Sequence, residues 1–320
     1  MDFDVVALGE LLVDFTENGK TNQGNSLFEA CPGGAPCNVL AMLQKLGKRC
    51  AFVGKVGDDL FGKMLKNVVE AAGIDTRGLK MDPNIPTTLA FVQTAPDGDR
   101  DFSFYRKPGA DMMLTAQELP IELIQSARIF HFGTLSMTHE GVRQATFAAL
   151  ECAKEAGCLI SFDPNLRPPL WENLEQARAA IAYGLYQCNI LKIADNELKF
   201  MTGEQDFYKG AAKLQAQFPN IQVLNVTAGA GGSYSFYGSE QPVFVPACSL
   251  GGVIETTGAG DTFCASVLGY ILDHGIQNLT EDNRREMLTF ANTAAYIVTT
   301  RKGAIRAMPE RAEVYALMGK

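Results

Sequence analysis

Short apolar runs alternate with amphipathic segments along most of the chain. An apolar run at 4–9 ends in glycine and predicts a buried strand. The leucines of 38–46 then recur at helical spacing before Gly47, a residue suited to end a helix. A strand at 51–54 and a helix at 60–72 follow in the same order. This alternation predicts an α/β fold with a doubly wound, mainly parallel sheet and helices on both faces.

The alternation resumes in the C-terminal two thirds of the chain. Strands are predicted near 128–132, 158–162, 188–193 and 221–227, and helices near 139–156, 173–186, 195–202 and 206–217. A β-prone stretch at 233–245 precedes helical patterns at 261–274 and 284–299 and a short helix after Pro309. No repeat, low-complexity tract or linker divides the pattern, so we expect one domain over residues 1–320.

Residues 79–108 interrupt this order. Two β-prone runs, 87–93 and 100–106, flank a turn-forming cluster at 96–99 and predict a hairpin. Together with the segment near 11–30, we expect residues 79–108 to form a small β-lid inserted in the N-terminal half of the domain.

The second run of the hairpin ends in Phe-Ser-Phe-Tyr-Arg at 102–106. Because side chains alternate along a strand, Phe102, Phe104 and Arg106 are expected on one face. If that face covers a cleft, it forms an apolar cover with one charge at its tip. The alternative is that the same face packs on the main sheet.

The composition narrows the classes of partner. Of the 320 residues, 47% are hydrophobic, which is enough for a large core and excludes disorder of the whole chain. The 28 basic and 36 acidic side chains give a net charge of -8. This balance argues against nucleic acid or a membrane surface as partner, but leaves room for a local basic pocket for a small anion.

The sequence shows no feature of export. Its first four residues carry no positive side chain, and no apolar run approaches the length of a bilayer span. The eight cysteines include no Cys-x-x-Cys pair and are expected to be reduced thiols. We therefore expect a cytoplasmic protein.

The segment with the most chemical information is Thr-Thr-Gly-Ala-Gly-Asp at 256–261, directly before an apolar helical run. Free amides at a helix start bind anions, and such small residues let a phosphate approach the backbone. The carboxylate of Asp261 would repel a static anion, but it could take a proton from a hydroxyl during phosphoryl transfer. A glycine-rich turn capped by Asp261 explains the local pattern equally well.

Other candidates follow predicted strands. Gly33 and Gly34 precede Asn38 at a strand-to-helix entry, where a ligand can reach the main chain; a plain tight turn is the alternative. Arg167 ends the run Asp-Pro-Asn-Leu-Arg at 163–167, where α/β sheets bind ligands, although an ordinary surface salt bridge is equally compatible. The segments 192–197 and 227–232 also follow strands, and in isolation both are typical of solvated loops. The three histidines lack metal-ligand spacing and a Walker A motif is absent, so no metal ligand is assigned.

Taken together, these segments resemble the ribokinase-like carbohydrate kinase family and, within it, the fructokinases. The early motif is Gly-Gly-Ala-Pro-Cys-Asn at 33–38, and the late signature is the segment 256–261. The similarity runs from residue 8 to residue 304. The segments 9–15, 104–112 and 163–171 also look like fructokinase. 2-Keto-3-deoxygluconate kinases share arginines like Arg106 and Arg167 and are the nearest rival.

The resemblance implies an ATP-dependent transfer to the 6-hydroxyl of D-fructose. Asp261 would be the base, with Arg167 and the amides of Gly258, Ala259 and Gly260 around the transferring phosphoryl group. The sugar would be held by Asp14, Gly33, Gly34, Asn38, Arg106, Asn165 and Asp261. The nucleotide and Mg²⁺ would be held by Lys192, Glu197, Thr227, Gly229, Gly232, Gly258, Gly260 and Asn292. The implied partners are a small sugar and ATP, and a homodimer through the lid and a use of K⁺ remain open.

The sequence also departs from the family pattern. Ala194 replaces the usual Asn or Ser, and Glu255 replaces an Asp close to where many members bind a monovalent cation. Ala228 replaces a common Leu, and Gly231 stands where many members carry Lys. Two alternatives therefore stay open: a 2-keto-3-deoxygluconate kinase, and a catalytically silent family member that only binds a sugar.

Overall fold

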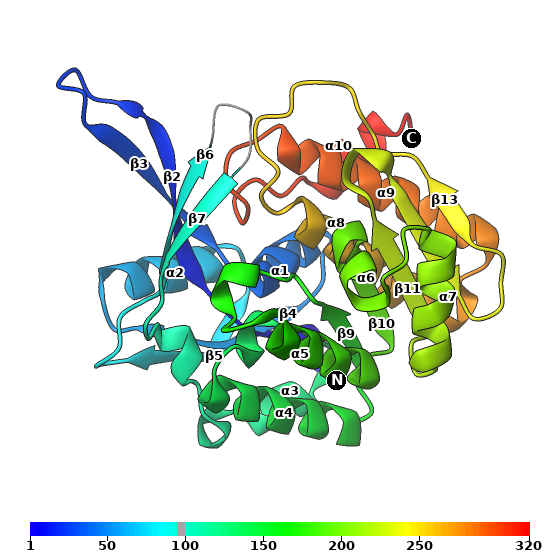
Figure 1. The fold of residues 1–320 in the computed structure, drawn as a ribbon, viewed down its shortest axis with the longest axis horizontal. Helices are drawn as coiled ribbons and strands as arrows, with labels where there is room; N and C mark the ends of the chain where they lie inside the picture. Colours follow the sequence, from blue (N-terminus) through cyan, green and yellow to red (C-terminus); the bar gives the residue numbers. More distant parts are fainter. Residues whose placement is uncertain (95–99) are drawn as a thin grey trace.

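The computed structural model describes residues 1–94 and 100–320 and contains two sheets. The larger sheet has nine strands in the order β13-β12-β11-β10-β9-β8-β1-β4-β5 (Figure 1). Its strands are β1 (Phe3–Leu8), β4 (Cys50–Gly57), β5 (Asp75–Asp82), β8 (Ala127–Gly133), β9 (Leu159–Asp163), β10 (Ile190–Ala194), β11 (Val223–Thr227), β12 (Ser233–Tyr237) and β13 (Val243–Val245). The strands from β11 to β5 are parallel, and β12 and β13 add an antiparallel edge. The doubly wound α/β fold predicted from the alternation is confirmed.

Helices cover both faces of this sheet (Figure 1). Those packed on one face are α1 (Ala35–Lys45), α2 (Leu60–Ala71), α8 (Ala259–His274), α9 (Glu281–Thr299) and α10 (Arg311–Leu317). Those on the other face are α3 (Ile121–Gln125), α4 (Glu140–Glu155), α5 (Leu174–Gln187), α6 (Asp195–Thr202) and α7 (Phe207–Gln217). Alternate residues of β1 supply the two cores, since Val5 and Ala7 pack on one side and Val6 and Leu8 on the other.

The second sheet projects from the N-terminal half of the molecule (Figure 1). Its four strands run in the order β3-β2-β6-β7 and are β2 (Leu12–Lys20), β3 (Ser26–Gly33), β6 (Leu89–Thr94) and β7 (Arg100–Tyr105). The antiparallel pairing of β6 and β7 confirms the predicted hairpin, whose turn at 96–99 lies outside the described residues. These strands fall within the segments expected to form a lid. Residues 79–82, however, belong to β5 of the main sheet.

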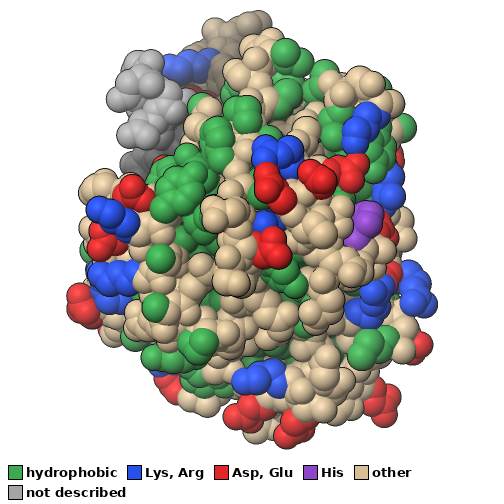
Figure 2. Space-filling view, turned by 90° about the vertical axis from the view of Figure 1, so that its right-hand side faces the viewer, with side chains coloured by type: hydrophobic (Ala, Val, Ile, Leu, Met, Phe, Trp, Pro, Cys, Tyr) green, Lys and Arg blue, Asp and Glu red, His purple; other side chains and the backbone are tan. Residues whose placement is uncertain are grey.

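Two surface features bear on the expected partners. On the face drawn in Figure 2, lysine and arginine side chains are interspersed with aspartate and glutamate. None of the helices in the described ranges is both long and apolar enough to span a bilayer.

Candidate active site

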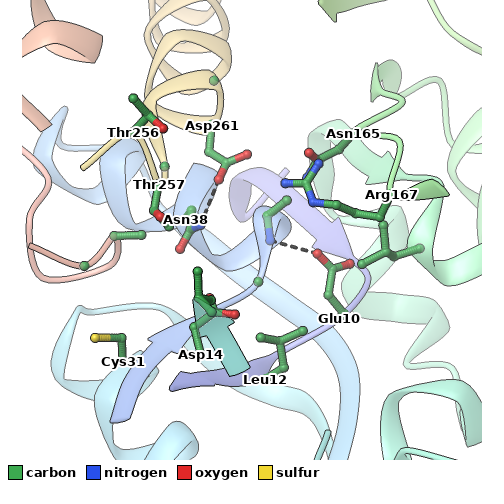
Figure 3. A pocket seen from close by; sticks show the side chains of 18 of the residues that line it. Glu10, Leu12, Asp14, Cys31, Asn38, Asn165, Arg167, Thr256, Thr257 and Asp261 are labelled. Atoms are coloured by element: carbon green, nitrogen blue, oxygen red, sulfur yellow. Dashed lines mark hydrogen bonds between the residues drawn. The ribbon is translucent and has the colours of Figure 1, made fainter. Parts of the chain in front are cut away.

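A pocket of about 500 Å³ lies between the carboxyl ends of the main-sheet strands and the four-stranded sheet (Figure 3). This volume lies within the usual range of small-molecule sites, and the position is where α/β sheets bind ligands. The predicted site residues that line it are Asp14, Gly34, Asn38, Asn165, Arg167, Lys192, Gly258, Gly260 and Asp261. The pocket therefore brings together residues from both halves of the chain.

Asp261 stands in the first turn of α8, at one wall of the pocket. It is 9% exposed, and its Oδ2 accepts a hydrogen bond from Asn38 Nδ2 at 2.8 Å (Figure 3). Burial raises the pKa of Asp261 to about 6, although the Asn38 bond lowers it. A carboxylate that faces a pocket and titrates near neutral pH is suited to act as a general base.

The turn that precedes Asp261 depends on glycine. Gly258 is the residue before α8 and has a φ of 79°, in the left-handed region that other residues rarely adopt. A Cβ on Gly260 would lie 3.1 Å from Lys192 Nζ, so the first turn of α8 rests directly against that ammonium group. The Ala259 amide donates to Thr256 O at 3.3 Å and does not line the pocket. A helix start with an ammonium group beside it favours a bound anion.

The entry to α1 forms the opposite wall. Gly34 has a φ of 128°, and a Cβ there would lie 2.4 Å from Glu10 O. Glu10 Oε1 accepts from the Ala35 amide at 2.8 Å and so caps the start of α1. A Cβ on Gly33 would meet Asp14 Oδ2 at 2.4 Å, so this glycine acts by making room for the Asp14 carboxylate.

Asn38 carries an unsatisfied polar atom. Its Oδ1 is buried and has no hydrogen-bond partner in the part of the chain that the structure describes. Buried polar atoms are nearly always paired in folded proteins. A hydrogen-bond donor on a bound molecule, such as a hydroxyl group, would satisfy this oxygen.

Asn165 and Arg167 follow β9 and face the pocket across from Asp261 (Figure 3). Asn165 has a φ of 45°, the only positive value at a non-glycine residue within 1–94 and 100–320. Asparagine tolerates this conformation better than most residues, and such backbone strain is common at functional sites. Arg167 Nη1 donates only to the neighbouring carbonyl of Leu166, at 3.3 Å, among the contacts that the described residues provide.

A buried cluster of charged side chains, Lys192, Asp163 and Glu197, packs against the segment that follows β9. Lys192 Nζ lies 2.9 Å from Asp163 Oδ2, and both side chains are at most 8% exposed. Although burial opposes it, the carboxylates of Asp163 and Glu197 raise the pKa of Lys192, so this side chain stays charged. Glu197 accepts from the amides of Leu166 and Ala194 at 2.7 and 2.8 Å and thereby joins the β9 and β10 loops.

Several residues expected at the site do not line this pocket within the described ranges: Gly33, Arg106, Glu197, Thr227, Gly229, Gly232, Ala259 and Asn292. Thr227 and the turn Gly229–Gly231 end β11, farther along the same sheet edge. Asn292 Nδ2 donates to Val245 O and Pro246 O, and its Oδ1 accepts from Ser233 Oγ. Three of the residues expected at the nucleotide therefore line the pocket, namely Lys192, Gly258 and Gly260, and the others do not.

Arg106 is not at the tip of the hairpin face. Strand β7 ends at Tyr105, so the alternation along the strand no longer determines where Arg106 points. The side chain is buried and ion-paired with Asp111, whereas Phe104 lines the pocket as expected. The side chain of Phe102 lies outside the described part of the structure.

Some lining residues were not among the sequence candidates. Glu10, Thr257 and Glu255 all line the pocket, and Glu255 Oε2 accepts from the Gly303 amide at 3.2 Å. The sequence pattern that could have predicted Glu10 as a site residue is its position directly after Gly9, which follows the buried strand β1. Ligands of α/β sheets bind at the carboxyl ends of the strands, so a carboxylate at such a position, like Arg167, can be predicted to face a ligand.

Comparisons with known proteins agree with this geometry. A model of the pfkB family of carbohydrate kinases matches residues 2–311. Probable fructokinase-2 of Arabidopsis thaliana is 42% identical over an alignment of 320 positions, which covers 98% of this chain and 95% of that protein.

Two solved structures are similar over nearly their whole length. The crystal structure of a fructokinase from Xylella fastidiosa with bound ATP is 30% identical, covers 100% of this chain and 99% of its own, and has a TM-score of 0.90. A double mutant of the fructokinase from Vibrio cholerae O395, with fructose, ADP and potassium ion bound, is also 30% identical. It covers 98% of each chain with a TM-score of 0.87.

Proposed function

Because the chain belongs to the pfkB family of carbohydrate kinases, we propose that it transfers the γ-phosphoryl group of ATP to the 6-hydroxyl of D-fructose. The observation that carries the proposal is the buried Asp261 carboxylate, held by Asn38 at a helix start that favours an anion. The similarity to fructokinases supports fructose as the acceptor and ATP as the donor.

In the proposed reaction, Asp261 takes the proton of the 6-hydroxyl. The hydroxyl oxygen forms a bond to the γ-phosphorus while the bond from that phosphorus to the β–γ bridging oxygen breaks, and ADP leaves. The amides at the start of α8 and the Arg167 guanidinium stabilise the charge on the transferring group. On the sugar side, Asp14 and Asn38 hold hydroxyl groups, and Asn165 lies between sugar and phosphate.

We propose that the nucleotide binds beside the pocket, along the edge formed by Thr227, Gly229, Gly232 and Asn292. Mg²⁺ would neutralise the phosphates of ATP. Glu197, in the first turn of α6, is the carboxylate among the residues expected on the nucleotide side.

We propose that the four-stranded sheet acts as a lid. Alternate residues of β2 face opposite sides of this sheet. Asp14 and Thr16 line the pocket, whereas the ring of Phe15 stacks on that of Phe91 with 4.9 Å between the ring centroids. Phe104 lines the pocket from β7. A cover of this kind excludes water, which otherwise competes with the sugar as phosphoryl acceptor.

The outer side of the lid supports a homodimer as a further proposal. Phe91 contacts Phe28 and Tyr105, which are 39% and 67% exposed. Exposed aromatic side chains on one sheet face are typical of interaction surfaces. Light scattering of the purified protein tests it, and a monomer at all concentrations contradicts it.

A coupled assay of sugar-dependent ADP release tests the function. Fructose, 2-keto-3-deoxygluconate, ribose and adenosine are compared as acceptors at equal concentration. We expect fructose to give the highest kcat/KM. A higher value for another acceptor contradicts the fructose assignment, and sugar binding without ADP release supports a catalytically silent protein.

A further inference from the structure

Arg106 and Asp111 form a buried ion pair close to the pocket. Arg106 Nη2 lies 2.6 Å from Asp111 Oδ2, and Arg106 Nε donates to the same oxygen at 2.8 Å. The two side chains are 3% and 2% exposed. Both contacts converge on one carboxylate oxygen and are charge-assisted, so the pair is stronger than a neutral hydrogen bond.

Two further donors of Arg106 are also occupied. Its Nη1 donates to Thr138 Oγ1 at 2.8 Å, and its Nη2 donates to Leu135 O at 3.1 Å. The guanidinium group is therefore held in one orientation from three directions. In this arrangement it has little capacity left to bind a ligand.

Asp111 is held from its other side. Its Oδ1 accepts from Thr88 Oγ1 at 2.5 Å. A Cβ on Gly109 would lie 1.7 Å from Thr88 Oγ1 and 2.8 Å from Asp111 Oδ1, so the backbone packs tightly against this contact. The carboxylate is fixed in place and can keep Arg106 in its position.

The pair lies directly behind the pocket wall. Leu135, whose carbonyl binds Arg106, lines the pocket, and so does Glu10. Burial raises the pKa of Glu10 to about 7, and Asp111 and Arg106 also shift it in opposite directions. The two charges are thus within electrostatic reach of a side chain that faces the ligand.

We propose that Asp111 is a specificity-determining positioning residue, which selects a neutral acceptor sugar by holding Arg106 behind the wall. With Arg106 withdrawn, the nearby side chains facing the sugar include the carboxylates of Glu10 and Asp14. Carboxylates accept hydrogen bonds from hydroxyl groups, whereas they repel an acceptor that carries a carboxylate of its own. The inference rests on the proposed sugar kinase function and adds that the acceptor sugar is uncharged.

The test compares kcat/KM for 2-keto-3-deoxygluconate and for fructose. In Asp111→Ala, the guanidinium is released, and we expect the ratio of keto acid to fructose to rise at least about tenfold. The double variant Arg106→Ala/Asp111→Ala has no guanidinium to release, so its ratio should return to within about twofold of the wild type. A ratio that rises equally in both variants overturns the proposal, because a loosened wall would then explain it.

Two further variants keep the test decisive if Asp111→Ala does not fold. Asp111→Asn preserves the shape and the Thr88 contact but removes the charge, so the ratio should move in the same direction. Thr138→Val removes a neighbouring contact of Arg106 while Asp111 stays, so the ratio should not change. An unchanged ratio in a folded Asp111→Asn enzyme, judged by its melting temperature, overturns the proposal.

Measurements on the wild-type protein separate this inference from the proposed function. If the wild type phosphorylates fructose and the keto acid equally well, the selection by Asp111 is wrong although the kinase function stands. If the wild type phosphorylates neither acceptor, the proposed function itself is wrong.

Discussion

The main body of the protein and the four-stranded sheet lie on two sides of the pocket, and they differ in how deeply their residues are buried. All eight residues of β4 in the main sheet are buried, whereas β2 and β3 of the four-stranded sheet are buried only near their base. Asp261, Lys192 and Asp163 stand on the main body, where dense packing fixes them. The four-stranded sheet has exposed residues along most of β3.

This difference separates two kinds of role. Groups that must meet a transition state within a fraction of an ångström stand on the buried wall. In the proposed function, the four-stranded sheet would contribute contacts that a bound sugar keeps throughout the reaction. We therefore expect changes in the main body to lower kcat, and changes in the four-stranded sheet to raise KM.

The largest expected effect is that of Asp261→Asn. The amide still accepts a hydrogen bond from Asn38 but cannot take a proton, so kcat should fall by about 10²–10⁴-fold. Steady-state kinetics with fructose measure the loss, and circular dichroism confirms the fold. Turnover close to that of the wild type would remove Asp261 from the proposed mechanism.

Arg167→Ala should follow, with a loss of about 10²-fold in kcat, because one donor to the transferring group is removed. Its side chain makes few contacts within the described chain, so the melting temperature should change little. A large fall in melting temperature with unchanged kinetics would instead identify a structural salt bridge.

The pH dependence follows from the raised pKa of Asp261. Since the base must be ionised, kcat should fall about tenfold per pH unit below pH 6. The folded protein holds this proton more tightly than the unfolded chain, so the associated stabilisation is complete below pH 3.8 and is lost as the pH rises through 6. The stability of Asp261→Asn relative to the wild type should therefore rise between pH 5 and pH 8, by about 1.4 kcal/mol. Thermal melting at both values measures the gain, and a constant difference contradicts the assignment.

The same substitution in the two sheets sharpens the comparison. Phe91→Ala removes the stack on Phe15 and should raise the KM for fructose about fivefold, with little change in kcat or in the main melting transition. Phe132→Ala, in the main core beside Phe162, should lower the free energy of unfolding by about 3–5 kcal/mol. Equal losses of stability in both variants would show that the two walls are equally part of the core.

The smallest expected effect concerns potassium. Glu255 accepts a hydrogen bond from the Gly303 amide, so its carboxylate is already engaged close to where many family members bind a monovalent cation. We expect turnover in potassium and in a bulky organic cation, at equal ionic strength, to differ little. Strong activation by potassium would show that the cation site tolerates Glu255.

Local pattern predicted most of the main body, because a buried parallel strand and an amphipathic helix each leave a short-range signal. It predicted β1, α2 and the hairpin of β6 and β7 close to their observed bounds. Strands β2 and β3 were expected only as part of a lid segment, since their exposed polar residues weaken the alternation.

The candidate site was predicted in parts rather than as a whole. Asn38 and Asp261 were each identified from local motifs, but their hydrogen bond depends on the packing of two distant helices. Arg106 shows the same limit more sharply. Its partners Asp111, Thr138 and Leu135 come from segments outside the hairpin, so a strand pattern could not predict that it turns inward.

The bond between Asn38 and Asp261 also has a consequence for synthesis on the ribosome. The two residues are 223 positions apart, so α1 emerges long before α8 exists. A nascent chain that stops before α8 carries the residues proposed to hold the sugar, but neither the base nor the helix start that faces it. A chain truncated before α8 also lacks the residues of α8 that pack in the main core, so it should neither complete this fold nor consume nucleotide.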